Sequence, residues 1–388
     1  MKTTPLAWKN LTADWRRLAL GVAGVAFAAL LMFMQNGFRN ALLDSPVQIL
    51  RLLRCDLIAV SVARYSLPTD QVFPKTLFER SVTDADVVAA TPLYFERPLA
   101  QLRVEGFPRR PIRVVGIPKQ PGWFNDQTIE SEIKKLSSTG TALLDRQSRL
   151  AYGFQWPRAG AEMDQAMQLA EQPLDVVGLI NIGADFVNDG TLVVSHDSFA
   201  HFFPDRGAGR PLATIDLGLY RIRNNANPDA VADRLSKLDP LRWMVMTRQQ
   251  LIDREIAFWN RQTPIGTIFF VGSMMGFAVG VIICYQILFN SIHDSLPEYA
   301  TLKAMGYGNR FFVLLVVKQS LYLAILGFLP ALATSWLSFQ VINWAAGLPM
   351  LFTPSRIALV FGMTVVMCLV SGLMTVRRLL NADPASLF

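Results

Sequence analysis

Four long stretches without any charged residue constrain this chain more than any other feature of its sequence. They are Leu18 to Phe38, Pro264 to Phe289, Gln319 to Ser355 and Ile357 to Val376. About 20 consecutive apolar residues span the hydrocarbon core of a bilayer as one α-helix. Charged residues make up only 17% of the whole chain, and they are concentrated outside these stretches. The sequence therefore predicts a membrane protein with a large soluble part, and it excludes a disordered chain and a purely cytosolic enzyme.

Basic residues beside the apolar stretches predict the orientation of the chain. Lys2, Lys9, Arg16 and Arg17 precede the first stretch, and a pair of arginines at 377–378 follows the last. Positive charge is enriched on the cytoplasmic side of short flanks. We count four transmembrane helices, the third of them beginning near 311, and therefore expect both termini in the cytoplasm.

The segment between the first two stretches, Arg39 to Thr263, is nearly neutral, with 27 basic and 26 acidic residues. The net charge of +7 thus reflects the cytoplasmic flanks, and it does not indicate nucleic-acid binding. We predict a multi-pass membrane protein with this segment outside the cytoplasm. The expected segments are a cytoplasmic amphipathic helix (1–17), transmembrane helix one (18–38), an outer domain with a stalk (39–263), transmembrane helix two (264–289), a cytoplasmic loop (290–310), transmembrane helix three (311–345), a short outer loop (346–356), transmembrane helix four (357–376) and a cytoplasmic tail (377–388).

The expected outer domain has an α+β pattern. Short β-rich runs are predicted as strands at Asp56 to Val62, Val87 to Phe95, Ile112 to Ile117, Asp175 to Ile182, Thr191 to Ser195, Ala213 to Ile222 and Trp243 to Met246. Helices are predicted at Ala161 to Ala170, Pro228 to Leu238 and Arg248 to Trp259. A break between two subdomains is expected in the Gly/Pro/Ser-rich stretch Ser137 to Gly160. The last helix runs almost directly into the second apolar stretch, which predicts a stalk.

Few residues suggest catalysis or metal binding. His196, Asp197 and His201 form the one histidine cluster, but two helical side chains five residues apart point about 140° away from each other. No third ligand is nearby in sequence, so we expect no metal here. Cys55 is the one cysteine of the soluble part and can form no disulfide there. The sequence has no G-x-x-x-x-G-K-[ST] phosphate loop, so we expect that this chain does not hydrolyse ATP.

The second apolar stretch has a ridge of small residues. Gly272, Gly276 and Gly280 follow the G-x-x-x-G spacing, which lets another helix approach closely. The ridge is therefore a candidate for helix packing or for a dimer contact.

The loop after the second stretch carries the signals of a short helix. Ser295 and Glu298 have the spacing of a capping box, Pro297 stands in the first turn, and Gly306 is placed for a left-handed C-cap. Tyr299, Leu302 and Met305 would share an apolar face. An acid at its start and the single base Lys303 favour a protein partner over anionic lipid as the surface that this helix contacts.

The N-terminal segment is predicted to be amphipathic as well. Trp8, Leu11, Trp15 and Leu18 recur at helical spacing among basic residues. We expect this helix to contact membrane lipids at the interface rather than a specific protein.

These motifs resemble the FtsX/MacB superfamily of ABC transporter permeases, and among them most closely the DevC type. The resemblance covers the whole chain, with one helix, a large outer domain and three further helices in order. The residues that carry it are LPEYATLKAMGY at Leu296–Tyr307, LMFMQ at Leu31–Gln35 with Gly37-Phe38-Arg39, MGFAVG at Met275–Gly280 with YQIL at Tyr285–Leu288, and the ending Ala382-Asp383-Pro384-Ala385.

This resemblance implies an assembly in the bacterial, cyanobacterial-like inner membrane, with residues 39–263 and the loop 346–356 in the periplasm. In such families a permease homodimer recruits two copies of an ABC ATPase subunit, which uses ATP and Mg while the permease binds no cofactor. A periplasmic adaptor (membrane fusion) protein and a TolC-like outer-membrane channel complete the assembly. The protein after which the DevC type is named exports heterocyst glycolipids. The loop helix is then the coupling helix that docks on the ATPase, through Glu298, Leu302 and Met305. Outward movement of periplasmic substrate by mechanotransmission is the implied activity.

Three other functions stay open. A relative of this architecture acts as a signalling permease that activates a periplasmic cell-wall hydrolase, and its outer partner would distinguish it from an exporter. Lipoprotein release is another transport function of similar permeases, but the full-length DevC-like match weighs against it. An enzyme hidden in the outer domain is disfavoured because the catalytic motifs are absent. The apolar spans contain no charged path for a hydrophilic substrate, which favours export from the periplasmic side or from the outer leaflet.

Overall fold

The computed structural model describes residues 6–346 and 350–380, apart from 157–162, 164, 184 and 186. The chain forms two compact units. Met1–Asn40, Pro264–Ile342 and Met350–Phe388 make up the first, which we call the helical unit, and Ala41–Thr263 with Asn343–Pro349 make up the second, the sheet unit.

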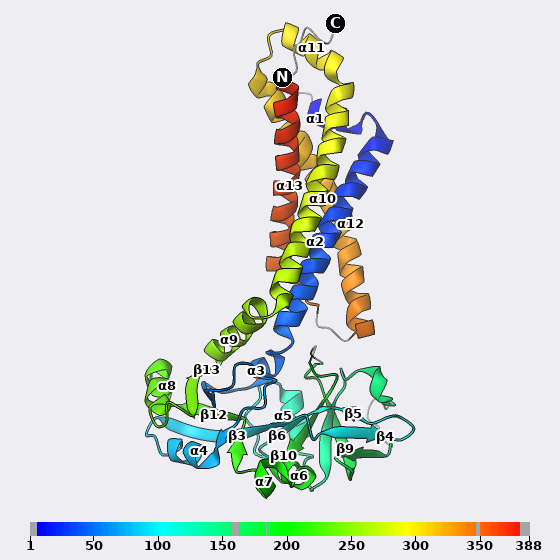
Figure 1. The fold of residues 1–388 in the computed structure, drawn as a ribbon. Helices are drawn as coiled ribbons and strands as arrows, with labels where there is room; N and C mark the ends of the chain where they lie inside the picture. The colour runs from blue at the N-terminus through cyan, green and yellow to red at the C-terminus, as the bar shows by residue number, and fades with distance from the viewer. Residues whose placement is uncertain are drawn as a thin grey trace. The chain divides into compact units, whose positions relative to one another are not determined.

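The helical unit contains long apolar helices and two short ones (Figure 1). Its elements are α1 (Leu6–Thr12), α2 (Trp15–Asp44), α10 (Pro264–Asp294), α11 (Leu296–Ala304), α12 (Asn309–Ala346) and α13 (Pro354–Leu380). Four of them, α2, α10, α12 and α13, are long and apolar enough to cross a membrane. The predicted arrangement of one such helix, a large domain and three more is confirmed. Helices α2, α10 and α13 extend a few residues beyond their charge-free stretches, whereas α12 begins ten residues before its stretch and ends at Ala346 within it.

The four long helices pack around a shared apolar core. Buried residues in it include Met32 of α2, Cys284 of α10, Leu323 of α12 and Cys368 of α13. The two cysteines are free, and their sulfur atoms lie 3.5 Å apart. Every buried charged residue in the described part of the chain belongs to the sheet unit instead.

The sheet unit is built on one sheet of eleven strands in the order β13-β1-β12-β3-β6-β10-β7-β9-β8-β4-β5. Its strands are β1 (Leu57–Ser61), β3 (Val87–Glu96), β4 (Gln101–Val104), β5 (Arg110–Pro111), β6 (Arg113–Ile117), β7 (Thr141–Asp145), β8 (Met167–Leu169), β9 (Gln172–Ile180), β10 (Thr191–Ser195), β12 (Leu217–Ile222) and β13 (Trp243–Thr247). Strands β2 (Phe73–Pro74) and β11 (Thr214–Ile215) form a separate pair. Pairing is mostly antiparallel, but β6 with β10 and β7 with β9 are parallel.

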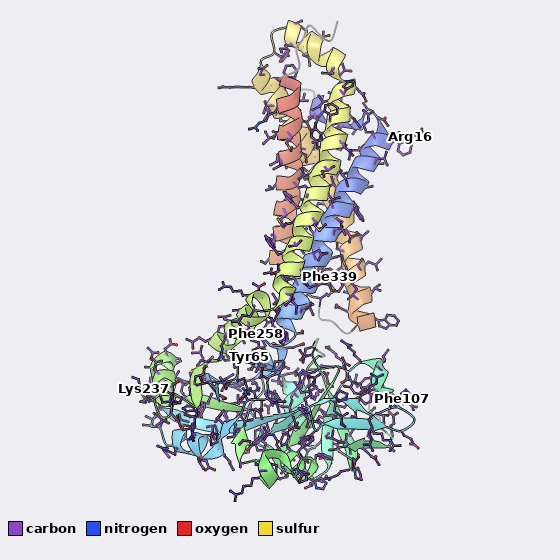
Figure 2. All side chains as sticks on the ribbon, in the orientation of Figure 1. Arg16, Tyr65, Phe107, Lys237, Phe258 and Phe339 are labelled. Atoms are coloured by element: carbon purple, nitrogen blue, oxygen red, sulfur yellow. The ribbon has the colours of Figure 1, made fainter. Side chains whose placement is uncertain are left out.

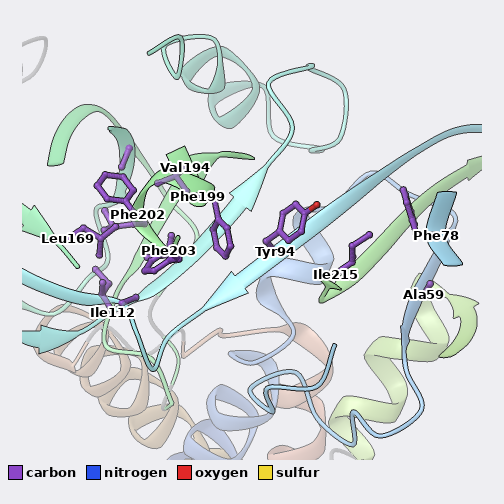
Figure 3. Close-up of a cluster of buried hydrophobic side chains, with 14 of the residues drawn as sticks. Ala59, Phe78, Tyr94, Ile112, Leu169, Val194, Phe199, Phe202, Phe203 and Ile215 are labelled. Carbon is purple, nitrogen blue, oxygen red and sulfur yellow. The ribbon is translucent and has the colours of Figure 1, made fainter. Parts of the chain in front are cut away.

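Helices cover both faces of this sheet. Helices α4 (Lys75–Ser81), α6 (His196–Phe202) and α8 (Pro228–Ser236) contribute to one core, and α3 (Gln48–Leu52), α5 (Gln127–Ile133) and α9 (Arg248–Arg261) contribute to the other. The short helices η1 (Leu150–Tyr152) and α7 (Arg206–Gly209) complete the unit. Alternate residues of β1 separate accordingly, with Leu57 in the first core and Ile58 in the second, because successive side chains of a strand point to opposite faces. Figure 3 shows part of the first core around Tyr94 and Phe199.

Three sequence predictions for this unit need correction. The described residues of the expected helix Ala161 to Ala170 include the strand β8, which pairs with β4 and β9. The expected strand Ala213 to Ile222 is divided into β11 and β12 at Asp216. The sheet is continuous through the described residues of Ser137 to Gly160, because β10 pairs both with β7 inside this stretch and with β6 before it.

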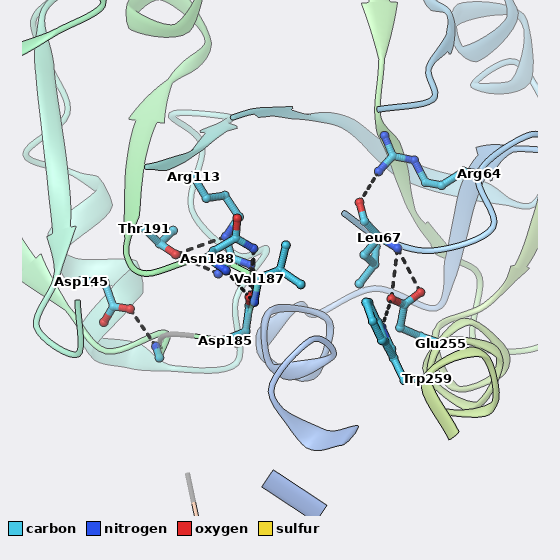
Figure 4. A network of polar contacts seen from close by, with 11 residues as sticks. Arg64, Leu67, Arg113, Asp145, Asp185, Val187, Asn188, Thr191, Glu255 and Trp259 are labelled. Carbon is cyan, nitrogen blue, oxygen red and sulfur yellow. Dashed lines mark hydrogen bonds and ion pairs between the residues drawn. The ribbon is translucent and has the colours of Figure 1, made fainter. Parts of the chain in front are cut away.

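Asp216 lies between β11 and β12 and is buried. Its buried carboxylate accepts hydrogen bonds from Arg64 and Arg206, each at 2.6 Å, and from the backbone N–H of Phe95 at 2.9 Å. Another ion pair joins the half-buried Arg113 to the buried Asp185 at 2.6 Å (Figure 4). Buried charges are tolerated when they are paired and hydrogen-bonded in this way.

Candidate functional site

The predicted coupling helix is α11, which directly follows α10 and precedes α12 in the helical unit. Its expected capping box does not form. Ser295 makes no capping bond, and its hydroxyl instead donates to the carbonyl of Ser291 at 3.0 Å, while the Glu298 side chain is exposed. A serine hydroxyl commonly bonds back to the carbonyl four residues earlier when the helix continues through it. Glu298 therefore does not take part in a capping box at the start of α11.

The predicted C-cap is confirmed. Gly306 has a φ of +92°, the left-handed region that glycine enters without steric cost. Its N–H donates to the carbonyl of Lys303 at 3.0 Å, and the N–H of Tyr307 donates to the carbonyl of Leu302 at 3.2 Å. These two bonds form a Schellman motif, which satisfies the last carbonyls of the helix. The end of α11 is thus fixed by the backbone itself.

The apolar face that the sequence predicted is divided between two environments. Leu302 is half-buried and packs on the residues that we call the anchor cluster, which are Ala7, Ile292, Phe312, Leu315, Val316 and Val376. Met305, in contrast, is 63% exposed, and Lys303 is exposed beside it. The side chains of Pro297 and Tyr299 lie outside the described residues. Leu302 therefore holds the helix in place, and Met305 with Glu298 and Lys303 is available to a partner.

The N-terminal segment packs on the same anchor cluster. The prediction of one helix over 1–17 needs correction, because α1 ends at Thr12 and α2 begins at Trp15. Asp14 caps the start of α2 by accepting hydrogen bonds from the N–H groups of Arg16 and Arg17. The ring of Trp8 meets Tyr322 of α12 edge-on, with centroids 5.5 Å apart. Contact with lipid stays a prediction for the exposed faces of this segment.

The start of α2 is also tied to the end of α10. Arg17 forms an ion pair with Asp294, the last residue of α10, and it contacts the carbonyl of Asn290. The predicted glycine ridge of α10 lies along the same pair of helices. A Cβ at Gly272 would meet Gln35, one at Gly276 would contact Leu31, and one at Gly280 would overlap Ala28, all on α2.

The glycine ridge is therefore a helix-packing surface inside the chain. Gly280 is also approached by Met367 of α13. Close approach of backbones is the reason for small residues at such positions. Because α2 and α13 already fill the ridge, a second copy of the chain would need another surface, and the dimer role of these glycines stays a prediction.

Helix α9 lies in the sheet unit and leads into α10. It begins with a capping box between Thr247 and Gln250 and ends at Arg261, only three residues before Pro264. Leu251 and Ile252 are buried in the core on one face of the sheet. The predicted helix Arg248 to Trp259 is thus confirmed and is two residues longer.

A buried carboxylate fixes α9 to a neighbouring loop. Glu255 is 2% exposed, and its two oxygens accept the backbone N–H of Leu67 at 3.1 and 3.0 Å and the indole N–H of Trp259 at 2.8 Å (Figure 4). Burial raises the pKa of Glu255 above its ordinary value. The ring of Phe258 lies against that of Tyr65, a residue of the same loop as Leu67, in a tilted arrangement with centroids 5.4 Å apart (Figure 2).

The sequence prediction overlooked Glu255, although a signal was available. The residue lies four positions after Leu251 and four before Trp259, so it stands on the apolar face of α9. A lone acid on such a face predicts a buried, hydrogen-bonded carboxylate.

The histidines have structural surroundings. His196 packs edge-on against Tyr94 at 5.0 Å, and its Nε2 lies 3.1 Å from the carbonyl of Pro92. Burial lowers the pKa of His196 to about 4, so the ring is neutral and donates from Nε2. No group of three or more His, Cys, Asp or Glu residues that could hold a metal occurs among the described residues.

Comparisons with known proteins found one family model and several solved structures that are similar to parts of this chain. Residues 270–384 match the family model of the FtsX-like permease C-terminal domain, a range that includes α11, α12, α13 and most of α10. No curated protein matches the sequence. Among solved structures, the periplasmic region of MacB from Actinobacillus actinomycetemcomitans is similar at 10% identity and a TM-score of 0.34, covering 52% of this chain and 92% of that one. The extracellular domain of the noncanonic ABC-type transporter YknZ from Gram-positive bacteria is similar at 11% identity and a TM-score of 0.31, covering 50% of this chain and 98% of that one.

Proposed function

We propose, from the premise that residues 270–384 form an FtsX-like permease C-terminal domain, that the chain is the permease subunit of a MacB/FtsX-type ABC transporter. In this proposal two copies of a separate ATPase subunit bind ATP and Mg and dock on a permease homodimer. The family match supports the permease assignment, and the chain itself performs no ATP hydrolysis.

The observation that carries the proposal is the construction of α11. Leu302 and the C-terminal backbone bonds hold this short helix on the anchor cluster, while Glu298, Lys303 and Met305 project away from it. A short helix that packs on the anchor cluster through Leu302 and exposes charged and apolar side chains elsewhere suits docking of a protein partner in the cytoplasm. The ATPase subunit is the partner that the family match implies.

The geometry favours a mechanism in which the helices transmit force to the sheet unit over one in which substrate passes between the helices. The described part of the helical unit buries no charged residue, so it offers no ionic path for a hydrophilic cargo. Helix α9 is held in the sheet unit by Glu255 and its apolar face, and α10 follows it in the chain. A movement of α10 driven from α11 would therefore reach the sheet unit through α9.

The finer proposal is a DevC-type exporter. Both termini would be cytoplasmic and residues 39–263 periplasmic, where the sheet unit would meet an adaptor protein and, through it, a TolC-like outer-membrane channel. The cargo would be lipid-like, such as a glycolipid, or another periplasmic substrate. The resemblance of the sequence motifs supports this version.

The test is purification of the tagged full chain from native membranes in a gentle detergent, with mass spectrometry of the proteins and lipids that accompany it. The variant Met305→Asp changes the exposed face of α11 without touching the anchor cluster. Its matched control is Ala13→Asp, which adds the same charge at an exposed position between α1 and α2. We expect the ATPase subunit with the wild type and the control, and at least tenfold less with Met305→Asp.

The other proteins recovered distinguish the alternatives. An adaptor and a channel alongside the ATPase support export, and a specifically enriched lipid identifies the cargo. An ATPase together with a cell-wall hydrolase places the protein among signalling permeases. The absence of any ATPase from wild-type preparations would refute the transporter assignment.

A further inference from the structure

A hollow lined by arginines lies at one end of the sheet, where four elements converge. Strand β1 begins there, β12 ends beside it, β3 begins next to β12, and α9 starts directly after β13. The hollow has a volume of about 770 Å³ and is lined by Arg54, Arg221, Arg223 and Arg248. Ligand sites in proteins commonly have volumes of roughly 300–1,000 Å³.

The positive charge of this hollow is not neutralised. No ion pair among the described residues includes any of the four arginines, whereas Arg64, Arg113, Arg206 and Arg234 all have carboxylate partners. One carboxylate, Asp56, lines the hollow, and it accepts the backbone N–H of Ile222 at 2.9 Å. The net charge of the residues that line the hollow is therefore strongly positive, although the 39–263 segment as a whole is almost neutral.

Two of the arginines are held in place before any ligand arrives. The guanidinium of Arg221 lies over the ring of Trp123, 4.4 Å from its centroid, and its buried Nε has no hydrogen-bond partner. Arg248 donates from Nη1 to the carbonyl of Leu53 at 2.5 Å, which leaves its other N–H groups available. Fixed guanidinium groups lose little freedom on binding and match the geometry of an oxyanion.

The remaining lining is compatible with an anion. Asn224 and Asn225 are exposed and contribute amide groups at the rim. Burial raises the pKa of Cys55 to about 12, so its thiol stays protonated and adds no negative charge.

We propose that this hollow binds a phosphate group, with Arg221 and Arg248 as its fixed ligands and with Arg54 and Arg223 adding charge from the rim. The group is either inorganic phosphate or the phosphate of a lipid headgroup, since both present the same oxyanion. The proposal adds a binding site to the sheet unit and does not rest on the transporter assignment.

The experiment is calorimetric titration of the full chain in neutral detergent with three probes. These are inorganic phosphate, dihexanoyl phosphatidic acid and, as the zwitterionic comparison, dihexanoyl phosphatidylcholine. Arg221→Gln and Arg248→Gln each remove one fixed ligand. Arg103→Gln is the matched control, because Arg103 is an exposed arginine on β4 outside the hollow.

We expect wild type and Arg103→Gln to bind a given probe, inorganic phosphate or phosphatidic acid, with the same affinity. Arg221→Gln and Arg248→Gln should each bind that probe with an affinity at least about tenfold lower, since each loses a charge-assisted hydrogen bond. Similar affinity for both probes identifies phosphate itself as the ligand, and a clear preference for phosphatidic acid identifies a lipid headgroup. Absence of binding by wild type, or equal binding by all variants, overturns the proposal. The proposal is also overturned if wild type binds no phosphate and Arg221→Gln loses an acidic protein partner instead.

A second measurement on the wild type covers variants that do not fold. Phosphate should protect Arg221 and Arg248 from modification by phenylglyoxal, as measured by peptide mass spectrometry, while Arg103 reacts at the same rate with and without phosphate. Equal reaction rates at all three positions contradict the site.

Discussion

Replacement of Glu255 by alanine tests whether α9 is held firmly enough in the sheet unit to transmit force. The change removes the acceptor of two donors, the backbone N–H of Leu67 and the indole N–H of Trp259. An unsatisfied buried donor costs about 1–3 kcal/mol. Both donors are half-buried, so water replaces part of the lost bonds.

The carboxylate itself reduces the net effect. Burial raises the pKa of Glu255, which means that its charged form is disfavoured in the folded protein, and alanine removes that cost. We therefore expect a net loss of about 1–3 kcal/mol in the local stability of α9, or roughly fivefold to 150-fold in its opening equilibrium. Glu255→Gln should be milder, because one amide oxygen can still accept from both donors.

Hydrogen–deuterium exchange of the full chain in detergent measures this effect. Peptides covering 248–263 should exchange faster in Glu255→Ala, with those covering 64–70 changing in parallel. Asp253→Ala is the matched control, since Asp253 is an exposed acid on the same helix and should change stability by no more than about 0.5 kcal/mol. Unchanged exchange in Glu255→Ala, or equal acceleration in the control, would show that this carboxylate does not hold α9.

Further predictions concern the anchor of α11, the buried histidine and the glycine ridge. Leu302→Ser should speed hydrogen exchange in α11 and reduce the amount of ATPase subunit that is purified with the chain. Met305→Ser should reduce the amount of ATPase subunit without changing hydrogen exchange. Identical exchange in the two variants contradicts this division of roles. Because the folded pKa of His196, about 4, lies below the ordinary 6.5, stability present above pH 6.5 is lost as the pH falls towards 4, by up to about 3 kcal/mol. His196→Gln keeps a donor and should flatten this dependence in urea unfolding from pH 7.5 to 4.5; an unaltered slope argues against His196 as its source. Gly280→Leu should lower the thermal stability of the detergent-solubilised chain by overpacking, at a cost of about 1–3 kcal/mol or more. The control Gly362→Leu should leave the thermal stability unchanged, since no atom lies within 4 Å of a Cβ placed there. Equal melting temperatures for the two variants refute the packing role of Gly280.

The long apolar helices could be predicted closely because their signal is local. A charge-free run of bilayer length determines a helix without reference to its neighbours, so α2, α10, α12 and α13 were located to within a few residues. Short elements of the sheet unit were harder. β7 is buried on both faces, so it lacks the alternation that identifies a half-exposed strand.

The candidate sites show the same limit. The end of α11 was predictable because Gly306 fixes its backbone locally, but the capping box failed because Ser295 bonds back to the preceding helix. The separation of Leu302 from Met305 depends on where α12 and α13 lie, which no loop motif contains. The arginine hollow is a more extreme case, since pairing of β1 with β12 and β13 is what brings Arg221 and Arg248 together.

The coupling proposed for this chain would have two covalent routes to residues 41–263 of the sheet unit, and the contacts of the helical unit link them. These residues continue into the helical unit through α2 at one end and through α10 at the other. Arg17 and Asp294 tie these two helices near α11, and the glycines of α10 keep them in contact along their length. A displacement that begins at α11 should therefore move both helices together, so the sheet unit would receive it at two points of its chain, next to α3 and next to α9. A single flexible link would allow the sheet unit to remain still while one helix moved, and two linked helices reduce that freedom.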